Sequence, residues 1–285
     1  MALDDHVRFA VGVPNVGPYA DPEAQLALST AAEGAGWDGY FLWDHILYPE
    51  DWPVLDPWVA LSAIAARTNR LVLGLLVAGV ARALPWEVAK RAASLDRLSG
   101  GRLILGAGLG SRPEEFTAFG QPADPRGRAE RLDEALEVID GLWSGAPYSF
   151  QGKHFTIASP PMHPVPLQRP RIPIWVGGRW PNRPPFRRAA RWDGVVPTHA
   201  SYGKGKTMPP DDLRELVAFV QRQRGGDRSF DVALEGRTPE GAEGWRVVEP
   251  YRAAGLTWWI EALGWWRGDV STALGRVRSG PPSVS

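Results

Sequence analysis

Short apolar runs alternate along the chain with longer segments whose apolar residues recur at helical spacing. Most of the runs are apolar throughout, which is typical of parallel strands buried on both faces. Their expected bounds are 7–13, 39–43, 71–77, 103–105, 174–178, 194–197, 231–235 and 257–260. The expected helices are 22–35, 58–67, one from Pro85, 128–143, 185–190, 210–224, 244–254 and 270–278. Eight strands, each followed by a helix, predict an α/β protein with a single (β/α)8 TIM barrel, and an open doubly wound sheet is the alternative.

The segment from Pro85 to Gly110 holds one complete unit of this pattern. Proline suits the first turn of a helix, and the Gly100-Gly101 pair suits its end. The apolar strand 103–105 follows at once. Three glycines come after it, where the backbone must turn sharply or admit a close neighbour: Gly106, Gly108 and Gly110.

Residues 145–172 interrupt the pattern with a proline-rich excursion that contains one strand-like piece, 148–157. Structureless loops of this length are uncommon in compact domains. We therefore interpret the excursion as an insertion between the fourth and fifth strands that lies over the core. Residues 1–280 then form one barrel domain, and residues 281–285 are expected to be a disordered tail.

The composition excludes several classes of function. The 285 residues include 32 basic and 32 acidic side chains, so no basic field predicts binding to nucleic acid or to an anionic membrane. The absence of cysteine excludes disulfides, thiolate nucleophiles and thiolate metal sites. No signal peptide or membrane-spanning run is visible, so we expect a cytoplasmic protein. Several of the 14 tryptophans lie near strand ends, where they either pack or form an aromatic rim suited to a planar ligand.

In a barrel of this kind the active site lies at the carboxyl ends of the strands. His45 follows the second strand, where a histidine can act as a general acid or hydrogen-bond donor, or can simply pack as a satisfied polar residue. Asp44 and His45 are adjacent and point to opposite faces, so they cannot share one ion, and we expect no metal site. Other residues at strand ends are candidates for a substrate pocket: Asn15, Arg112, His199, Trp258 and Glu261.

Two glycine-rich loops are candidates for binding a phosphate. The loop after the fourth strand differs from a dinucleotide fingerprint, because Ser111 stands at the third glycine position and no helix opens there. A tight turn at the rim is the simpler interpretation of that loop. Gly177-Gly178-Arg179 can present backbone N–H groups and a cation to a phosphate, or can be a loop that only needs positive φ.

At these residues the chain resembles the luciferase-like monooxygenase family, which includes bacterial luciferase and the oxidoreductases that use the deazaflavin coenzyme F420. The resemblance extends over residues 7–261. It rests on the order and spacing of several pieces: Trp43-Asp44-His45, residues 73–77, 89–96 leading into 99–106, Glu115-Phe116, 131–134 with Leu142-Trp143, and 173–178.

The resemblance implies a flavin or deazaflavin in the barrel mouth, with its ring near His45, Leu76 and Val77 and its phosphate near Gly177, Gly178 and Arg179. It also implies a cis peptide bond between Leu76 and Val77, a homodimer, and His45 as the catalytic residue. The remaining cofactor-binding candidates lie at nearby strand ends: Asp44, Gly106, Gly108 and Glu114. Glucose-6-phosphate dehydrogenases of the family carry a catalytic Glu after strand four, where Ser111 stands here, so we do not expect that sugar phosphate as the substrate.

The function implied by the resemblance is hydride transfer between F420 and a small organic substrate, because an Asp-His pair after strand two is typical of the deazaflavin branch. An FMN-dependent monooxygenase that uses O₂ is the alternative. Two further alternatives are a barrel that binds a flavin without turnover, and a non-redox phosphosugar isomerase or lyase. An isomerase or lyase needs an acid–base pair, and apart from His45 the rim offers only Glu114, Glu115 and Glu261 for it. The sequence does not predict the identity of the substrate.

Overall fold

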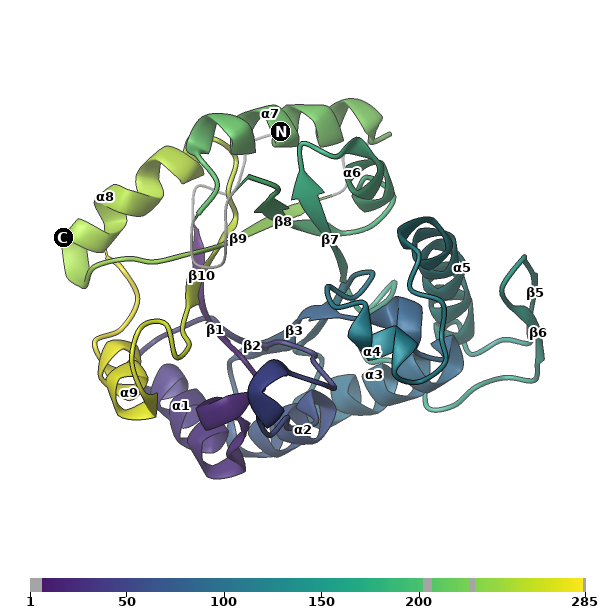
Figure 1. Ribbon diagram of the computed structural model, residues 1–285, viewed down its shortest axis with the longest axis horizontal. Coiled ribbons are helices and arrows are strands. Elements are labelled where there is room, and N and C mark those ends of the chain that lie inside the picture. The colour runs from purple at the N-terminus through teal and green to yellow at the C-terminus, as the bar shows by residue number, and fades with distance from the viewer. Residues whose placement is uncertain (1–6, 202–206, 226–228, 284–285) are drawn as a thin grey trace.

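Eight parallel strands close into a barrel in the computed structural model, which describes residues 7–201, 207–225 and 229–283 (Figure 1). The predicted (β/α)8 barrel is therefore confirmed. Around the barrel the strand order is β1, β10, β9, β8, β7, β4, β3, β2. The strands are β1 (Arg8–Val13), β2 (Gly39–Leu42), β3 (Val72–Ala78), β4 (Leu103–Ala107), β7 (Ile174–Trp180), β8 (Gly194–His199), β9 (Asp231–Gly236) and β10 (Trp258–Ala262).

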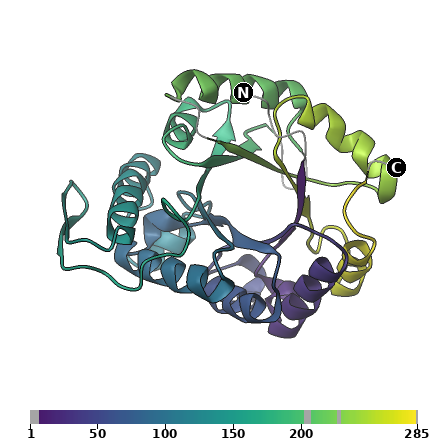
Figure 2. The same cartoon turned by 180° about the vertical axis from the view of Figure 1, so that it is seen from behind.

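Helices surround the barrel as an outer ring (Figures 1 and 2). Several begin at a proline preceded by an aspartate. Asp56, for example, accepts hydrogen bonds from the N–H groups of Trp58 and Val59. The helices are α1 (Pro22–Gly34), α2 (Pro57–Arg67), α3 (Pro85–Ser99), α4 (Glu114–Thr117), α5 (Pro125–Trp143), α6 (Arg183–Ala189), α7 (Pro210–Gln223), α8 (Gly241–Arg252) and α9 (Val270–Arg278), with 3₁₀ turns η1 (Gly17–Ala20), η2 (Pro49–Asp51) and η3 (Val80–Arg82).

Each barrel strand divides its side chains between two cores. On β1, Phe9, Val11 and Val13 pack outward with the buried faces of the helices, while Ala10 belongs to a separate cluster. That second cluster contains strand residues alone, which places it inside the barrel. Its buried members are Ala10, Phe41, Leu76, Ile104, Trp175, Val196, Ala233, Trp258 and Ile260.

The insertion between β4 and β7 differs from the predicted single strand. It forms an antiparallel hairpin of β5 (Tyr148–Gln151) and β6 (Thr156–Ser159). The hairpin lies outside the ring of helices, beside α5, and not over the barrel mouth (Figures 1 and 2). Glu134 of α5 holds its turn by accepting hydrogen bonds from the N–H groups of Lys153, His154 and Phe155.

The chain after α9 is packed at least as far as Pro282. This proline, which the sequence places in a disordered tail, is buried close to Gly244 of α8. Residues 284–285 of the expected tail lie outside the described residues. Among the helices of the described part of the chain, none combines the length and hydropathy needed to cross a membrane.

Candidate active site

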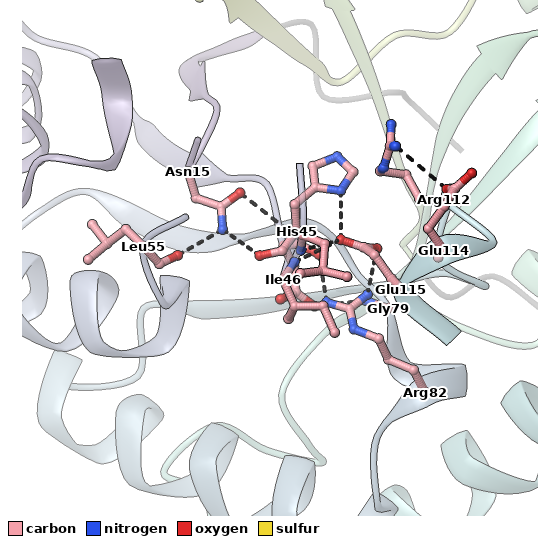
Figure 3. Close-up of polar contacts among 12 residues, drawn as sticks. Asn15, His45, Ile46, Leu55, Gly79, Arg82, Arg112, Glu114 and Glu115 are labelled. Atoms are coloured by element: carbon pink, nitrogen blue, oxygen red, sulfur yellow. Dashed lines mark hydrogen bonds and ion pairs between the residues drawn. The ribbon is translucent and has the colours of Figure 1, made fainter. Parts of the chain in front are cut away.

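His45 lies just past the carboxyl end of β2, and its ring is held by a buried carboxylate from another loop. The Nδ1 atom lies 3.0 Å from an oxygen of Glu115, which belongs to the short helix α4 after β4 (Figure 3). An ionised carboxylate can only accept, so Nδ1 carries the proton. Nε2 then faces the other side of the ring with no hydrogen-bond partner among the described residues. A histidine oriented in this way is suited to accept or donate a proton.

The same carboxylate fixes the backbone around His45. One oxygen of Glu115 also accepts hydrogen bonds from the N–H groups of Ile46 at 2.7 Å and Leu47 at 3.3 Å. On the opposite side, the Asn15 amide donates to the carbonyl oxygens of His45 and Leu55 and accepts from the His45 N–H. The loop is therefore tied from both sides, which fixes the position from which the imidazole projects (Figure 3).

A buried arginine joins the two acidic residues beneath the histidine. Arg82 of η3 lies 3.0 Å from the carboxylate of Asp44 and 3.5 Å from the second oxygen of Glu115. It also donates to the Asp44 carbonyl at 2.7 Å, while the Asp44 carboxylate accepts from the Gly79 N–H at 2.9 Å. Asp44 thus points away from the His45 ring and anchors the loop after β3, as the alternation of side chains predicts.

Burial and hydrogen bonding act in opposite directions on the two carboxylates. Burial raises the pKa of Asp44 above its usual range, and the charge of Arg82 and the Gly79 N–H only partly oppose that rise. At Glu115 burial also acts to raise the pKa. There the hydrogen bonds from His45 and Ile46, with the charge of Arg82, outweigh it and leave the pKa lowered. Glu115 is therefore the ionised acceptor that His45 requires.

Aromatic side chains form a rim beside His45. Trp43 and Tyr48 contact the imidazole edge-on, with ring centroids 5.9 and 5.2 Å away. The loop after β10 supplies two more indoles, of which Trp266 stacks on Trp43 at 5.5 Å and Trp265 packs edge-on against Tyr48 at 5.6 Å. We call the partly exposed set Trp43, Tyr48, Trp52, Trp265 and Trp266 the aromatic rim. The expectation of tryptophans at strand ends holds for this part of the mouth.

The bulge in β3 provides an apolar surface on the next strand of the barrel. Its pairing with β4 shifts register between Leu75 and Ala78, and the peptide bond between Leu76 and Val77 is cis, as predicted. Both side chains pack with the luminal cluster. An apolar face that is exposed inside a barrel mouth can support a planar ring.

The glycines after β4 make room for that bulge. A Cβ on Gly106 would lie 1.9 Å from the carbonyl oxygen of Leu75, and one on Gly108 would lie 2.6 Å from the Val77 side chain. Both positions, predicted to bind a cofactor, are thus explained by the close approach of β3 and β4. Contact with a cofactor remains a prediction for them.

The predicted phosphate loop lies at the end of β7. The pairing of β7 with β4 stops at Val176, while its pairing with β8 continues to Trp180, so one edge of residues 177–180 is left without a neighbouring strand. Arg179 is exposed there and makes no side-chain hydrogen bond or ion pair within the described residues. Packing also requires a glycine at position 178, because a Cβ there would lie 2.6 Å from Pro185 of α6.

Glu115, and not the cofactor-binding candidate Glu114, is the residue that contacts His45. The side chain of Glu114 is 63% exposed and lies 3.6 Å from Arg112, whereas Glu115 is 1% exposed and binds His45. Two adjacent residues in a helical turn face different directions, so only one of the two carboxylates can turn inward. Glu115, like Ser111, stands in the segment after β4, and the expectation that glucose 6-phosphate is not the substrate stays a prediction.

Three of the five predicted substrate residues lie at the rim. Arg112 packs over the Tyr48 ring at 5.4 Å, close to the site in Figure 3. His199 ends β8, where its Nε2 lies 3.3 Å from Asp212 and its Nδ1 accepts from the Ser201 N–H. Asn15 is fully buried with its amide engaged, so it positions the His45 loop and does not line an open pocket.

The other two lie away from the mouth. Trp258 is the first residue of β10, not one near its end, and stacks under Arg8 at the opposite end of the barrel. Glu261 projects outward and is fully buried in a polar cluster with Thr238, Arg267 and Arg276. The prediction ended this strand one residue before Glu261, which hid the fact that the carboxylate points toward the helices.

The fold and the rim define a TIM barrel with its candidate site at the carboxyl ends of the strands, as in enzymes of this architecture. Within the described ranges no group of three His, Cys, Asp or Glu side chains is arranged to hold a metal ion. The family model of the luciferase-like monooxygenases matches residues 7–239, so the chain belongs to that family. Its members are oxidoreductases and monooxygenases.

Comparison with known proteins gives the same assignment. An uncharacterised protein of Mycobacterium tuberculosis is 33% identical over 242 residues, which cover 76% of this chain and 79% of that protein. An F420-dependent glucose-6-phosphate dehydrogenase of Nakamurella multipartita is 32% identical over 201 residues, or 67% of this chain and 56% of that protein. The structure of an F420-dependent secondary alcohol dehydrogenase shares the fold, with a TM-score of 0.77 at 16% identity over 94% of this chain and 96% of that one. Other structures of the same fold are monooxygenases, one of them in complex with FMN.

Proposed function

We propose that this protein is an F420-dependent oxidoreductase that transfers hydride to or from a small organic substrate. The observation that carries the proposal is the oriented pair of His45 and Glu115 at the barrel mouth. The relative named as an F420-dependent glucose-6-phosphate dehydrogenase supports the choice of coenzyme. A homodimer, expected from the resemblance alone, stays a prediction.

The residues at the mouth fit a deazaflavin. Leu76 and Val77 offer an apolar surface for a planar ring, and the open edge of β7 with Arg179 offers backbone groups and a cation for a phosphate. A Cβ on Gly177 would lie 3.1–3.2 Å from the side chain of Val77. The apolar surface for the ring and the candidate phosphate loop are therefore adjacent. When bound there, the deazaflavin would supply the hydride chemistry.

His45 would handle the proton that accompanies the hydride. Glu115 holds the proton on Nδ1, so Nε2 is available to accept a proton from a substrate hydroxyl or, once protonated, to donate one to a substrate oxygen. When His45 is protonated, the positive charges of Arg82 and the imidazolium balance the negative charges of Asp44 and Glu115. This balance favours the protonated histidine, which is the product when His45 accepts a proton and the reactant when it donates one.

An FMN-dependent monooxygenase is the second candidate, favoured by the name of the family and by relatives of the same fold. A fluorescence titration of the purified protein with F420 and with FMN separates the two. We expect saturable binding of F420, and reduced F420 should be reoxidised by a substrate only when the enzyme is present. Tight binding without any turnover would favour a carrier, and binding of FMN alone would favour the monooxygenase.

A further inference from the structure

One carboxyl group in the barrel lumen has no part in the site described above. Glu235 of β9 is paired in register with Ile260 of β10, and Ala233 is paired with Trp258. These three neighbours all belong to the luminal cluster, and alternate strand residues share a face, so Glu235 also projects into the lumen. An ideal Cβ on Gly12 of β1 would lie 3.4 Å from its Oε1.

Glu235 is linked to the wall that holds His45. The indole of Trp43, which follows β2, lies close enough to its carboxyl to lower the pKa of Glu235. The Trp43 ring contacts the His45 ring edge-on at 5.9 Å and stacks on Trp266. The carboxyl therefore lies beside a member of the aromatic rim that also contacts the histidine.

The charge environment of Glu235 differs from that of the other glutamates buried at this end of the barrel. Glu115 is paired with Arg82, and Glu261 with Arg267. Glu235 makes no ion pair within the described residues, and its neighbours there are Gly12, Ile260 and Trp43. Burial raises the pKa of Glu235, and the neighbouring Trp43 indole opposes the rise only in part. The group is also partly exposed to the lumen, so a ligand can reach it.

The barrel order places this carboxyl opposite the expected cofactor surface. In the order β1, β10, β9, β8, β7, β4, β3, β2, four steps in either direction separate β9 from β3. A molecule that extends across the lumen from the Leu76–Val77 bulge therefore reaches the wall that carries Glu235. Its other surroundings are the apolar side chains of the aromatic rim.

We propose that Glu235, as a neutral carboxylic acid, donates a hydrogen bond to a carbonyl or hydroxyl oxygen of an aromatic substrate held in the barrel mouth. The proposal rests on the proposed function only in taking the β3 bulge as the side of the cofactor. A neutral carboxylic acid in an apolar pocket favours ligands that place an oxygen where the acid can donate a hydrogen bond. A hydrocarbon ligand at the same position would bury the O–H group without an acceptor.

Acetophenone and α-methylstyrene test this proposal, because they have nearly the same shape and differ in carrying C=O or C=CH₂. Their dissociation constants are measured by ligand-observed NMR on the wild type, Glu235→Leu and Glu235→Gln, with and without F420. We expect the wild type to prefer acetophenone by about 3- to 10-fold, the effect of one neutral hydrogen bond. Glu235→Leu should lose the preference, and Glu235→Gln, which keeps an N–H donor, should retain part of it.

The pH dependence distinguishes hydrogen bonding from a structural effect of the substitution. In the wild type the preference should fall as rising pH ionises the carboxyl, and in Glu235→Gln it should not change with pH. The proposal is overturned if Glu235→Leu keeps the wild-type preference, if Glu235→Gln follows the wild-type pH profile, or if neither probe binds the wild type saturably. Failure of F420 to bind, with the preference intact, would contradict the proposed function alone.

Discussion

Glu115→Gln is the substitution that tests the candidate site most sharply. Glutamine keeps the size of the side chain and one acceptor oxygen, so the hydrogen bonds from His45 and Ile46 can persist. The second oxygen, which faces Arg82 at 3.5 Å, becomes an amide that places N–H groups against a buried guanidinium. The substitution therefore removes a buried ion pair without creating a cavity.

The magnitude follows from the groups left without a partner. Arg82 loses one of its two counter-charges and keeps Asp44, so we expect Glu115→Gln to lower the free energy of unfolding by about 1–3 kcal/mol, less than the loss of a whole buried ion pair. Glu115→Ala also strands the backbone N–H groups of Ile46 and Leu47, and should cost about 3–5 kcal/mol. Glu114→Gln is the matched control: the side chain is 63% exposed, and the change should stay within about 0.5 kcal/mol.

Urea denaturation of the three variants beside the wild type measures these differences. The pH dependence is a second observable. Because the pKa of Glu115 is lowered in the folded protein, its contribution is complete above the ordinary value of 4.5 and is lost as the pH falls through the lowered pKa. The stability gap between the wild type and Glu115→Gln should therefore shrink in acid. Equal stability of Glu115→Gln and Glu114→Gln at neutral pH would refute the reasoning.

Three further substitutions separate the residues that serve chemistry from those that serve packing. His45→Ala should reduce turnover per folded molecule by about 10²–10⁴-fold and lower the unfolding free energy by about 1–3 kcal/mol through the lost hydrogen bond to Glu115, whereas preserved activity per folded molecule would mean that the ring only packs. Gly178→Val should lower the unfolding free energy by about 1–3 kcal/mol, because its side chain meets Pro185, and an unchanged denaturation midpoint would contradict this. Glu261→Gln should destabilise by about 3–5 kcal/mol and leave F420 affinity unchanged, and weakened binding in the folded variant would return Glu261 to the site.

The barrel could be predicted because its signals are local. Buried parallel strands are apolar runs, and their helices begin and end at residues with fixed conformational preferences, such as Pro85 and Gly100, whose φ of 72° suits glycine. The position of His45 after β2 follows from the same signals. The hairpin of β5 and β6 was predicted as the single strand 148–157, although Gly152 in its turn is a hairpin signal.

The polar network could not be predicted, because it joins residues distant in the sequence. Arg82 reaches Asp44 and Glu115 across three loops, and no local pattern distinguishes Glu115 from Glu114 as the partner of His45. Glu261 shows the converse difficulty. Its partners are Thr238, which follows β9, and Arg267, which follows its own strand. A carboxylate at a strand end therefore looked like a site residue, although it is part of the packed shell.

Binding of F420 is the central claim, and a fluorescence titration of the wild type and Arg179→Ala tests it directly. The account predicts that the wild type binds F420 saturably and more tightly than FMN. Arg179→Ala should bind F420 more weakly with an unchanged denaturation midpoint, because its exposed side chain supports no packing. Binding of FMN in preference to F420, or equal F420 affinity of the two proteins, would contradict the account.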